Sequence, residues 1–182
     1  SITPAVIGIM WKMNYDVDWG IINFLLKNLI PIYTPIPFIS TLNTVMPAVI
    51  IIDVWEWSPL VMLILLAGLQ SFPTEPFEAA QIDGASRSQV FRNLTLPMLT
   101  PSILVAVLLR TIDAFKTFDI IFVSSRGGPG TASLLTSQWA YELAFVQSGV
   151  PRMGYAAAIS VIMFYVTLAF CTAYYRRLSR LK

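Results

Sequence analysis

Histidine is absent from this 182-residue sequence, and cysteine occurs only once, as Cys171. The lack of histidine excludes Ser-His-Asp and Cys-His catalysis, and it removes imidazole as a metal ligand. One cysteine cannot build a disulfide framework, a CxxC pair or a thiolate metal site. We therefore predict no catalytic residue, no metal site and no cofactor in this chain.

Charge is also scarce, since 12% of the residues are charged and 56% are hydrophobic. An ordinary soluble domain has about 25% charged residues, so this composition indicates a membrane protein. A net charge of +2 is too small to suggest a nucleic-acid partner. Each of the four lysines follows a residue other than glycine, so the phosphate-binding pattern G-x-x-x-x-G-K-[ST] is missing and the chain is not an ATPase.

Three apolar runs are long enough to cross a bilayer, which takes about 20 residues. They cover residues 42–69, 98–123 and 154–175. The apolar start of the chain, up to Trp11, is too short to cross and is interpreted as the end of a truncated span. We predict an all-α, polytopic helical membrane fold, with residues 1–182 in a single transmembrane domain that is truncated at its N-terminus.

Several shorter segments connect these runs. Residues 20–30 predict an amphipathic helix along the membrane interface, and Thr131 to Val146 predict a helix that returns along or into the membrane. The tail RRLSRLK carries four positive charges and no acid, which places the C-terminus in the cytoplasm. Counting back from it places Gly127 outside, residues 71–97 inside and Asp16 outside.

Residues 71–97 form a polar segment between two apolar runs, and its first half predicts a short helix. Pro76 suits the first helical turn, where its missing N–H is not needed. Glu75 and Glu78 fall in the same turn, where the helix dipole favours negative charge. Gly84 suits the left-handed residue that ends a helix.

The second half of the segment predicts another helix that begins at once. Ser86 and Gln89 have the S-x-x-Q spacing of a capping box, in which each side chain bonds to the other residue's backbone. Pro97 marks the place where this helix must end or bend. The expected object is a helix, a tight turn and a second helix.

This segment resembles the cytoplasmic EAA loop of permease subunits from binding-protein-dependent ATP-binding-cassette (ABC) importers. The family pattern is Glu-Ala-Ala, then Asp-Gly-Ala, then Leu-Pro, and here these are Glu78-Ala79-Ala80, Asp83-Gly84-Ala85 and Leu96-Pro97. The strings AGLQSFPTEPFEAAQIDGAS and RTIDAFKTFDIIFV, with a later GGP, resemble carbohydrate permeases of the maltose or glycerol-phosphate type. Pro76 and Phe77 depart from the family, which commonly has Leu and Tyr there.

The resemblance implies a permease subunit of an ATP-driven sugar importer in a bacterial or archaeal cytoplasmic membrane. Its implied partners are a cytoplasmic ABC ATPase dimer, a second permease subunit, an extracytoplasmic sugar-binding protein, the sugar and membrane lipid. ATP hydrolysis would belong to the separate ATPase. The residues implied to couple to that ATPase are Glu78, Ala79, Ala80, Asp83 and Gly84.

Two carboxylates interrupt the first apolar run. Asp53 and Glu56 are three residues apart and share a helix face with Trp57. A charge at membrane depth costs at least about 2.5 kcal/mol, which is usually tolerated on a face that lines a polar cavity. The acids could instead lie near the outer headgroups or pair with a neighbouring helix. The resemblance favours the cavity for Glu56 and Trp57.

The most polar stripe of the second run combines Arg110, Asp113 and Thr117, at i, i+3 and i+7, with Lys116 beside them. The resemblance to maltose-type permeases implies that this stripe lines the substrate path. Guanidinium and carboxylate groups suit paired hydrogen bonds with hydroxyls. A structural role, in which these charges tie helices together, is equally compatible with the pattern.

Other functions remain open at this stage. The solute could be a polyol or glycerol phosphate, because Arg110 and Lys116 leave room for an anionic group. A secondary transporter or channel would predict uptake that does not depend on ATP. A membrane scaffold would predict that Glu56 and Asp113 can be replaced by alanine without loss of flux.

Overall fold

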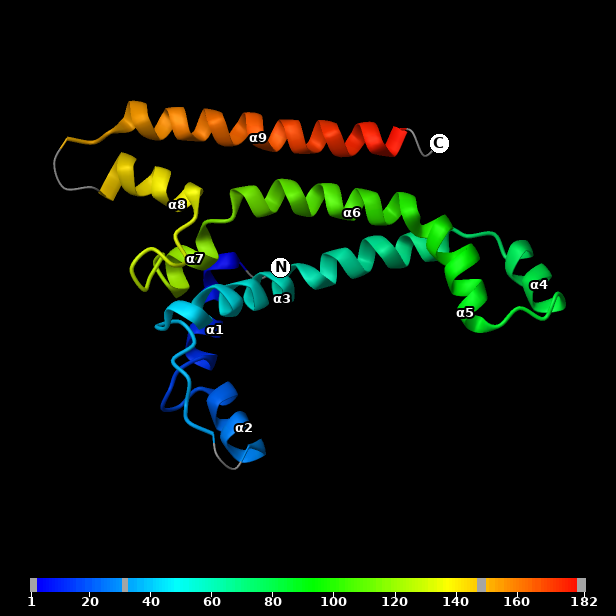
Figure 1. Cartoon of the computed structure of the whole chain (residues 1–182), viewed down its shortest axis with the longest axis horizontal. Coiled ribbons are helices and arrows are strands. Elements are labelled where there is room, and N and C mark those ends of the chain that lie inside the picture. The colour runs from blue at the N-terminus through cyan, green and yellow to red at the C-terminus, as the bar shows by residue number, and fades with distance from the viewer. Residues whose placement is uncertain (1–2, 31–32, 147–149, 180–182) are drawn as a thin grey trace. The chain divides into compact units, whose positions relative to one another are not determined.

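The computed structural model describes residues 3–30, 33–146 and 150–179, and the regular structure in these ranges is entirely helical (Figure 1). Three of the described helices are long and apolar enough to cross a membrane, over Leu42–Gln70, Arg87–Lys116 and Met153–Arg176. The predicted all-α fold is therefore confirmed for this part of the chain.

The chain divides into two compact units, each of which is described by itself. The first contains residues 1–56 and 114–168, and the second contains residues 57–113 and 169–182. This division does not test the single transmembrane domain, which stays a prediction.

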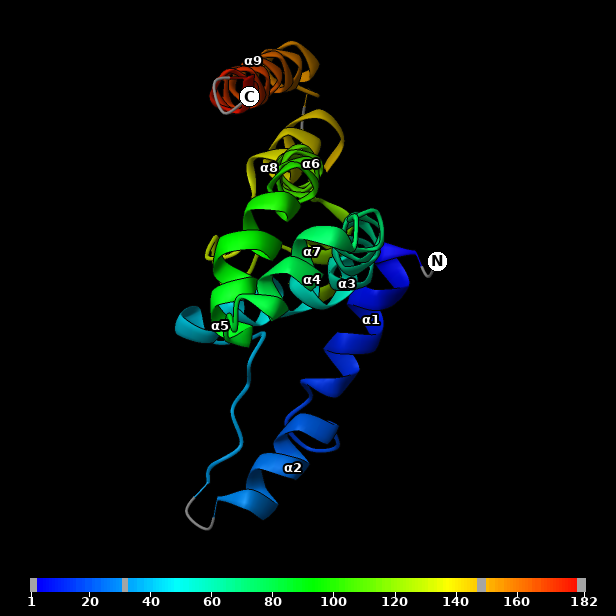
Figure 2. The ribbon, with the colours of Figure 1, turned by 90° about the vertical axis from the view of Figure 1, so that its right-hand side faces the viewer.

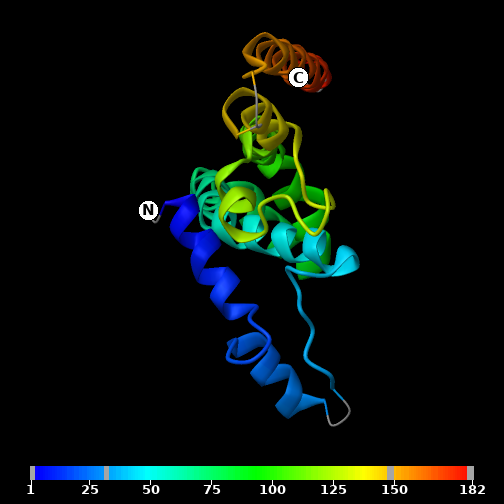
Figure 3. The same ribbon diagram turned by 90° about the vertical axis from the view of Figure 1, so that its left-hand side faces the viewer.

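The core of the first unit joins three helices. Helix α1 (Pro4–Asn14) packs closely on α7 (Asp119–Ser124), with the backbone of Gly8 against that of Ile120 (Figure 3). The start of α3 (Leu42–Gln70) completes the core. Its buried residues are Ile7, Tyr15, Val45, Ala48, Val49, Ile52, Ile120 and Ile121.

Tyr15 places a polar group inside this apolar core. Its hydroxyl donates to the carbonyl of Ala48 at 3.2 Å. Burial disfavours the phenolate and raises the pKa of Tyr15 to about 12, so the hydroxyl stays protonated and able to donate near neutral pH. The hydrogen bond fixes the chain after α1 to the second turn of α3.

Helix α2 (Ile21–Leu29) confirms the short helix predicted for residues 20–30. Its Asn23 is buried, and the side-chain amide donates to the carbonyls of Tyr15, Asp16 and Ile36. The same side chain accepts from the Ile36 N–H at 2.9 Å and from the Tyr33 hydroxyl at 2.6 Å. Asn23 thereby joins α2 to the extended segment that runs back past it (Figure 2). A proline, which cannot continue a helix, follows this segment at position 31, and that residue lies outside the described residues.

A helix also forms within the segment 131–146, as predicted, but it begins later. Residues 131–133 form a turn, α8 covers Thr136–Tyr141, and a π-helix, η2, covers Glu142–Val146. Apolar residues of α8 and η2 pack against the start of α9 (Met153–Ser179).

The helix predicted over residues 98–123 is in two parts. Two residues separate the end of helix α6 (Leu96–Lys116) from the start of α7. The Thr117 carbonyl lies between α6 and α7, and it accepts a hydrogen bond from the hydroxyl of Ser137 in α8 at 2.6 Å. Phe118 packs at 5.1 Å from the ring of Tyr141, which also holds the break in place.

In the second unit, the polar segment consists of α4 (Glu75–Ile82), α5 (Arg87–Val90) and a π-helix, η1 (Phe91–Thr95), that leads directly into α6. Pro97 lies in the first turn of α6 and does not end the helix. The run from Arg87 to Lys116 is continuous, and its direction changes between α5 and α6 (Figure 1). Of the two outcomes predicted for Pro97, the structure shows the bend.

Gly68 of α3 lies very close to Ser102 of α6. An added Cβ at Gly68 would stand 2.8 Å from the Ser102 Cβ and directly against its hydroxyl. We expect Gly68→Leu to lower the free energy of unfolding in detergent by about 1–3 kcal/mol, because overpacking forces helices apart.

The matched control is Gly154→Leu, since an added Cβ at Gly154 meets no atom within 4 Å. Denaturant unfolding of both variants checks the prediction. An equal loss of stability in the two variants would show that close packing at Gly68 is not the cause.

Candidate functional site

The two candidate regions of the second unit are the polar helix pair and the paired side chains of α3 and α6. Helix α4 begins as its sequence predicts. The Thr74 carbonyl accepts from the N–H groups of Phe77 and Glu78, at 3.0 and 3.1 Å. Pro76 lies in the first turn, and the acidic residues of that turn are Glu75 and Glu78. Negative charge therefore stands where the helix dipole stabilises it.

The end of α4 is a Schellman turn. Gly84 has φ of +72°, which is the left-handed conformation that glycine adopts without a steric penalty. Its N–H donates to the Gln81 carbonyl at 3.1 Å, and the N–H of Ala85 donates to the Ala80 carbonyl at 2.9 Å. These two bonds satisfy carbonyls that the helix leaves unpaired.

The next helix starts with the predicted capping box. The Gln89 N–H donates to the Ser86 hydroxyl at 3.4 Å, and the Ser86 N–H donates to the Gln89 side-chain carbonyl at 2.8 Å. The turn between the helices is thus closed by hydrogen bonds on both sides. The predicted helix, turn and second helix are confirmed as local structure.

The surface of α4 is open, since no residue of this helix is buried. Ile82 is 87% exposed, and Ala80 is half-buried. The other predicted coupling residues, Glu78, Ala79, Asp83 and Gly84, are all exposed. Within this unit, α4 therefore offers a small-residue surface with carboxylates at both ends.

Phe77 stands where the family commonly has tyrosine, and its ring packs against another ring of the same segment. Its ring stacks on that of Phe72 with centroids 6.2 Å apart and an interplanar angle of 12°. A phenyl ring is sufficient for this contact.

Trp57 and Arg110 are brought together by α3 and α6. The guanidinium carbon lies 4.8 Å from the centroid of the indole ring, within the range of a cation–π contact. Both side chains are half-buried. The sequence places each of them on the expected helix, but nothing in it pairs them, because they are 53 positions apart on different helices.

The other predicted path residues are distributed between the units. Asp113 follows Arg110 by one turn of α6 and is half-buried. Glu56 precedes Trp57 on α3, but it belongs to the first unit. Thr117 also belongs to the first unit and lies just beyond the end of α6, so the predicted face of that helix ends before it.

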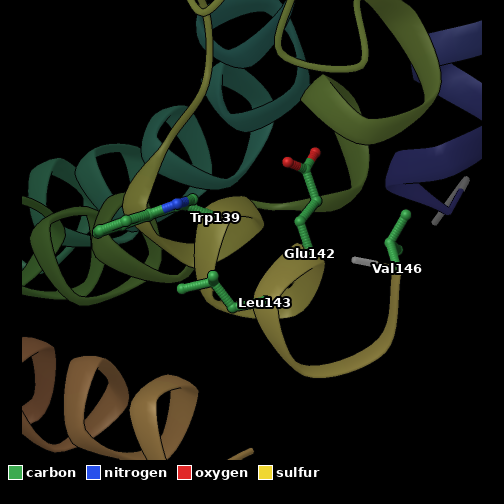
Figure 4. A pocket seen from close by; sticks show the side chains of 4 residues that line it. All are labelled: Trp139, Glu142, Leu143 and Val146. Carbon is green, nitrogen blue, oxygen red and sulfur yellow. The ribbon is translucent and has the colours of Figure 1, made fainter. Parts of the chain in front are cut away.

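The first unit has a shallow pocket of about 190 Å³ that sequence reasoning did not single out. Figure 4 shows its lining side chains, which project from α8 and η2. The Gln138 amide donates to the Glu142 carboxylate at 2.7 Å and so restrains one lining residue. The available sequence signal was the i, i+3, i+4, i+7 spacing of the lining residues Trp139, Glu142, Leu143 and Val146.

Comparison with known families gives one match over nearly the whole chain. Residues 2–181 match the model of a family described as binding-protein-dependent transport system inner membrane component.

Curated proteins named as permeases are also similar to this chain. A probable ABC transporter permease of Sinorhizobium fredii is 44% identical over 179 residues, which are 98% of this chain and 56% of the relative. The trehalose/maltose transport system permease MalF of Thermococcus litoralis is 40% identical over 164 residues, which are 90% of this chain and 54% of the relative. The chain thus spans about half the length of the curated relatives it matches.

A solved structure has the same fold. The crystal structure of a bacterial ABC transporter involved in the import of the acidic polysaccharide alginate aligns with a TM-score of 0.85. The alignment covers 98% of this chain and 61% of that chain, at 21% identity. At this identity, the likeness shows the fold alone.

The contact between Trp57 and Arg110 leads to a prediction of coupled stability. We expect a double-mutant cycle with Trp57→Leu and Arg110→Gln to give a coupling free energy of about 1 kcal/mol, measured by denaturant unfolding. The matched control pairs Trp57→Leu with Arg92→Gln, because Arg92 is an exposed arginine of the same unit. Additive effects in the first cycle would contradict a direct contact.

Proposed function

The chain belongs to the family of binding-protein-dependent transport system inner membrane components, and from this membership we propose that it is the permease part of an ATP-driven sugar importer. The match over residues 2–181 is the observation that carries the proposal. Three long apolar helices agree with a multi-pass membrane protein. The few polar residues in those helices would specify the solute path.

Sugar is the preferred solute class for two reasons. The relative at 40% identity is a trehalose/maltose permease. The indole of Trp57 and the guanidinium of Arg110 also offer an apolar face and planar donors, which are suited to a sugar ring and its hydroxyls. A polyol or glycerol phosphate is the second candidate, since the same guanidinium would bind an anionic group.

The proposed substrate path is lined by Glu56, Trp57, Arg110 and Asp113. All four are half-buried residues of α3 and α6, where a polar side chain needs either a partner or a polar cavity. The Thr117 carbonyl already accepts a hydrogen bond from Ser137, so Thr117 would offer the solute its side chain, at the end of the proposed path.

Coupling to ATP hydrolysis is proposed to occur through α4. Its exposed residues would dock into a cleft of a separate ATPase subunit, with Glu78 against a basic group and Ala79 and Ala80 permitting close packing. The continuous helical run from Arg87 to Arg110 would carry the motion along a bent path of about 35 Å, at about 1.5 Å per residue. Closure of an ATPase dimer would then rock the spans as rigid bodies.

The proposed assembly contains an ABC ATPase dimer, a second permease subunit and an extracytoplasmic binding protein for the sugar. In the proposed orientation, α4 and the basic C-terminal tail face the cytoplasm, and Gly127 faces outward. The last residues of that tail, 180–182, lie outside the described residues.

Gly84 provides the test of this mechanism. Proline fixes φ near −65° and has no N–H, so Gly84→Pro is incompatible both with the φ of +72° and with the bond to Gln81. We expect this variant to insert into the membrane and to leave ATP hydrolysis uncoupled from sugar uptake.

The matched control is Gly84→Asn, because asparagine tolerates the left-handed conformation and keeps the N–H. Uptake and ATP hydrolysis should remain coupled in this variant. Normal sugar uptake by Gly84→Pro would exclude the proposed role of the turn.

A further inference from the structure

Helix α2 has an apolar stripe that the described residues of the chain leave uncovered. The stripe consists of Ile21, Leu25 and Leu29, which are 55%, 50% and 76% exposed. Their spacing of i, i+4 and i+8 places them along one side of the helix. We propose that α2 lies within one leaflet of the bilayer, with this stripe among the lipid acyl chains.

The rotation of α2 about its axis is fixed by Asn23. The amide of Asn23 is 2% exposed and bonds to the backbone of Tyr15, Asp16 and Ile36. At 100° per residue, Asn23 and Lys27 occupy the side of the helix opposite Leu25. The stripe therefore faces away from the segment to which Asn23 is bonded and cannot turn inward without breaking these hydrogen bonds.

The depth of α2 follows from the hydrogen bond between Tyr15 and Ala48. Ala48 is six residues into α3, and at about 1.5 Å per residue it lies about 9 Å from the start of that helix. The buried amide of Asn23 holds α2 to the backbone of Tyr15. The candidate span of α3 begins at Leu42, so a point about 9 Å further along falls within the 5–10 Å to which an interfacial amphipathic helix buries its apolar face.

The direction of α2 agrees with this position. In the first unit, α2 runs across the direction of α3, as two perpendicular views show (Figures 1 and 2), and Figure 1 shows α2 level with the early turns of α3. A helix that crosses a membrane-spanning helix near its end lies in the plane of the membrane. Trp19, which is 64% exposed just before α2, adds the kind of side chain that favours this boundary.

Lipid fits the stripe better than a protein partner does. Phe24, which is 63% exposed, and the exposed Asn28 border the stripe. An apolar face of leucine and phenylalanine opposite a lysine is the composition of helices that lie in the membrane interface. Lys27, on the opposite side, is exposed and can reach the headgroups. The leaflet is the outer one in the orientation proposed above, but the embedding itself requires only that α3 crosses the membrane.

Spin-label accessibility tests this proposal. In a Cys171→Ser background, nitroxide labels are attached to Leu25→Cys and, as the matched control, to Lys27→Cys. The full-length permease, assembled with its partner subunits, is reconstituted in vesicles of phosphatidylethanolamine and phosphatidylglycerol. Collision with oxygen, which concentrates in lipid, is compared with collision with a water-soluble nickel chelate.

We expect the label at position 25 to collide mainly with oxygen and the label at position 27 mainly with the chelate, so the accessibility ratio reverses within two residues. Frequent collision of the label at 25 with the chelate would place the stripe in water. Protection of that label from both reagents would place it against protein. Either outcome would overturn the proposal, and neither depends on whether the solute is a sugar.

Discussion

The absence of water from the bilayer core is the constraint on which the rest of this structure depends. Every backbone N–H and C=O group at membrane depth has to be paired by the protein itself, and a long helix does so without other elements. Helices α3, α6 and α9 have this form. Where α6 stops, the Thr117 carbonyl receives the Ser137 hydroxyl at 2.6 Å, so the break is stabilised by α8. Polar side chains in such helices are costly, which is why Glu56, Arg110 and Asp113 are proposed to line the substrate path.

The turn at Gly84 is subject to a different constraint, because it joins two helices within a short, exposed segment. Its two backbone bonds and the capping box satisfy groups at both helix ends, which restricts the angle between α4 and α5. Helix α5 then continues through a π-helix into α6 without a loop. In the proposed importer, this continuity is what lets a small exposed helix act on residues deep in the membrane. In the proposal for α2, its apolar stripe would hold the first unit at the membrane surface.

Local signals in the sequence were sufficient wherever the cause of a structure lies within a few residues. Pro76, Gly84, Ser86 and Gln89 each act on backbone groups nearby, so the helix, turn and second helix could be predicted. The break after Lys116 could not, because it depends on Ser137 and on the ring of Tyr141. The role of Asn23 depends on Ile36, and the pairing of Trp57 with Arg110 depends on how two helices pack. Such long-range contacts leave no periodic pattern in a single sequence.

The most direct test of the central claim is the energy source of transport. The full-length permease is reconstituted in vesicles with its ATPase, second permease subunit and binding protein, and the uptake of radiolabelled trehalose or maltose is measured with and without ATP inside the ATPase-facing compartment. The account predicts that the sugar accumulates only when both ATP and the binding protein are present. Equal uptake without ATP would contradict it and would assign the chain to a secondary transporter or channel.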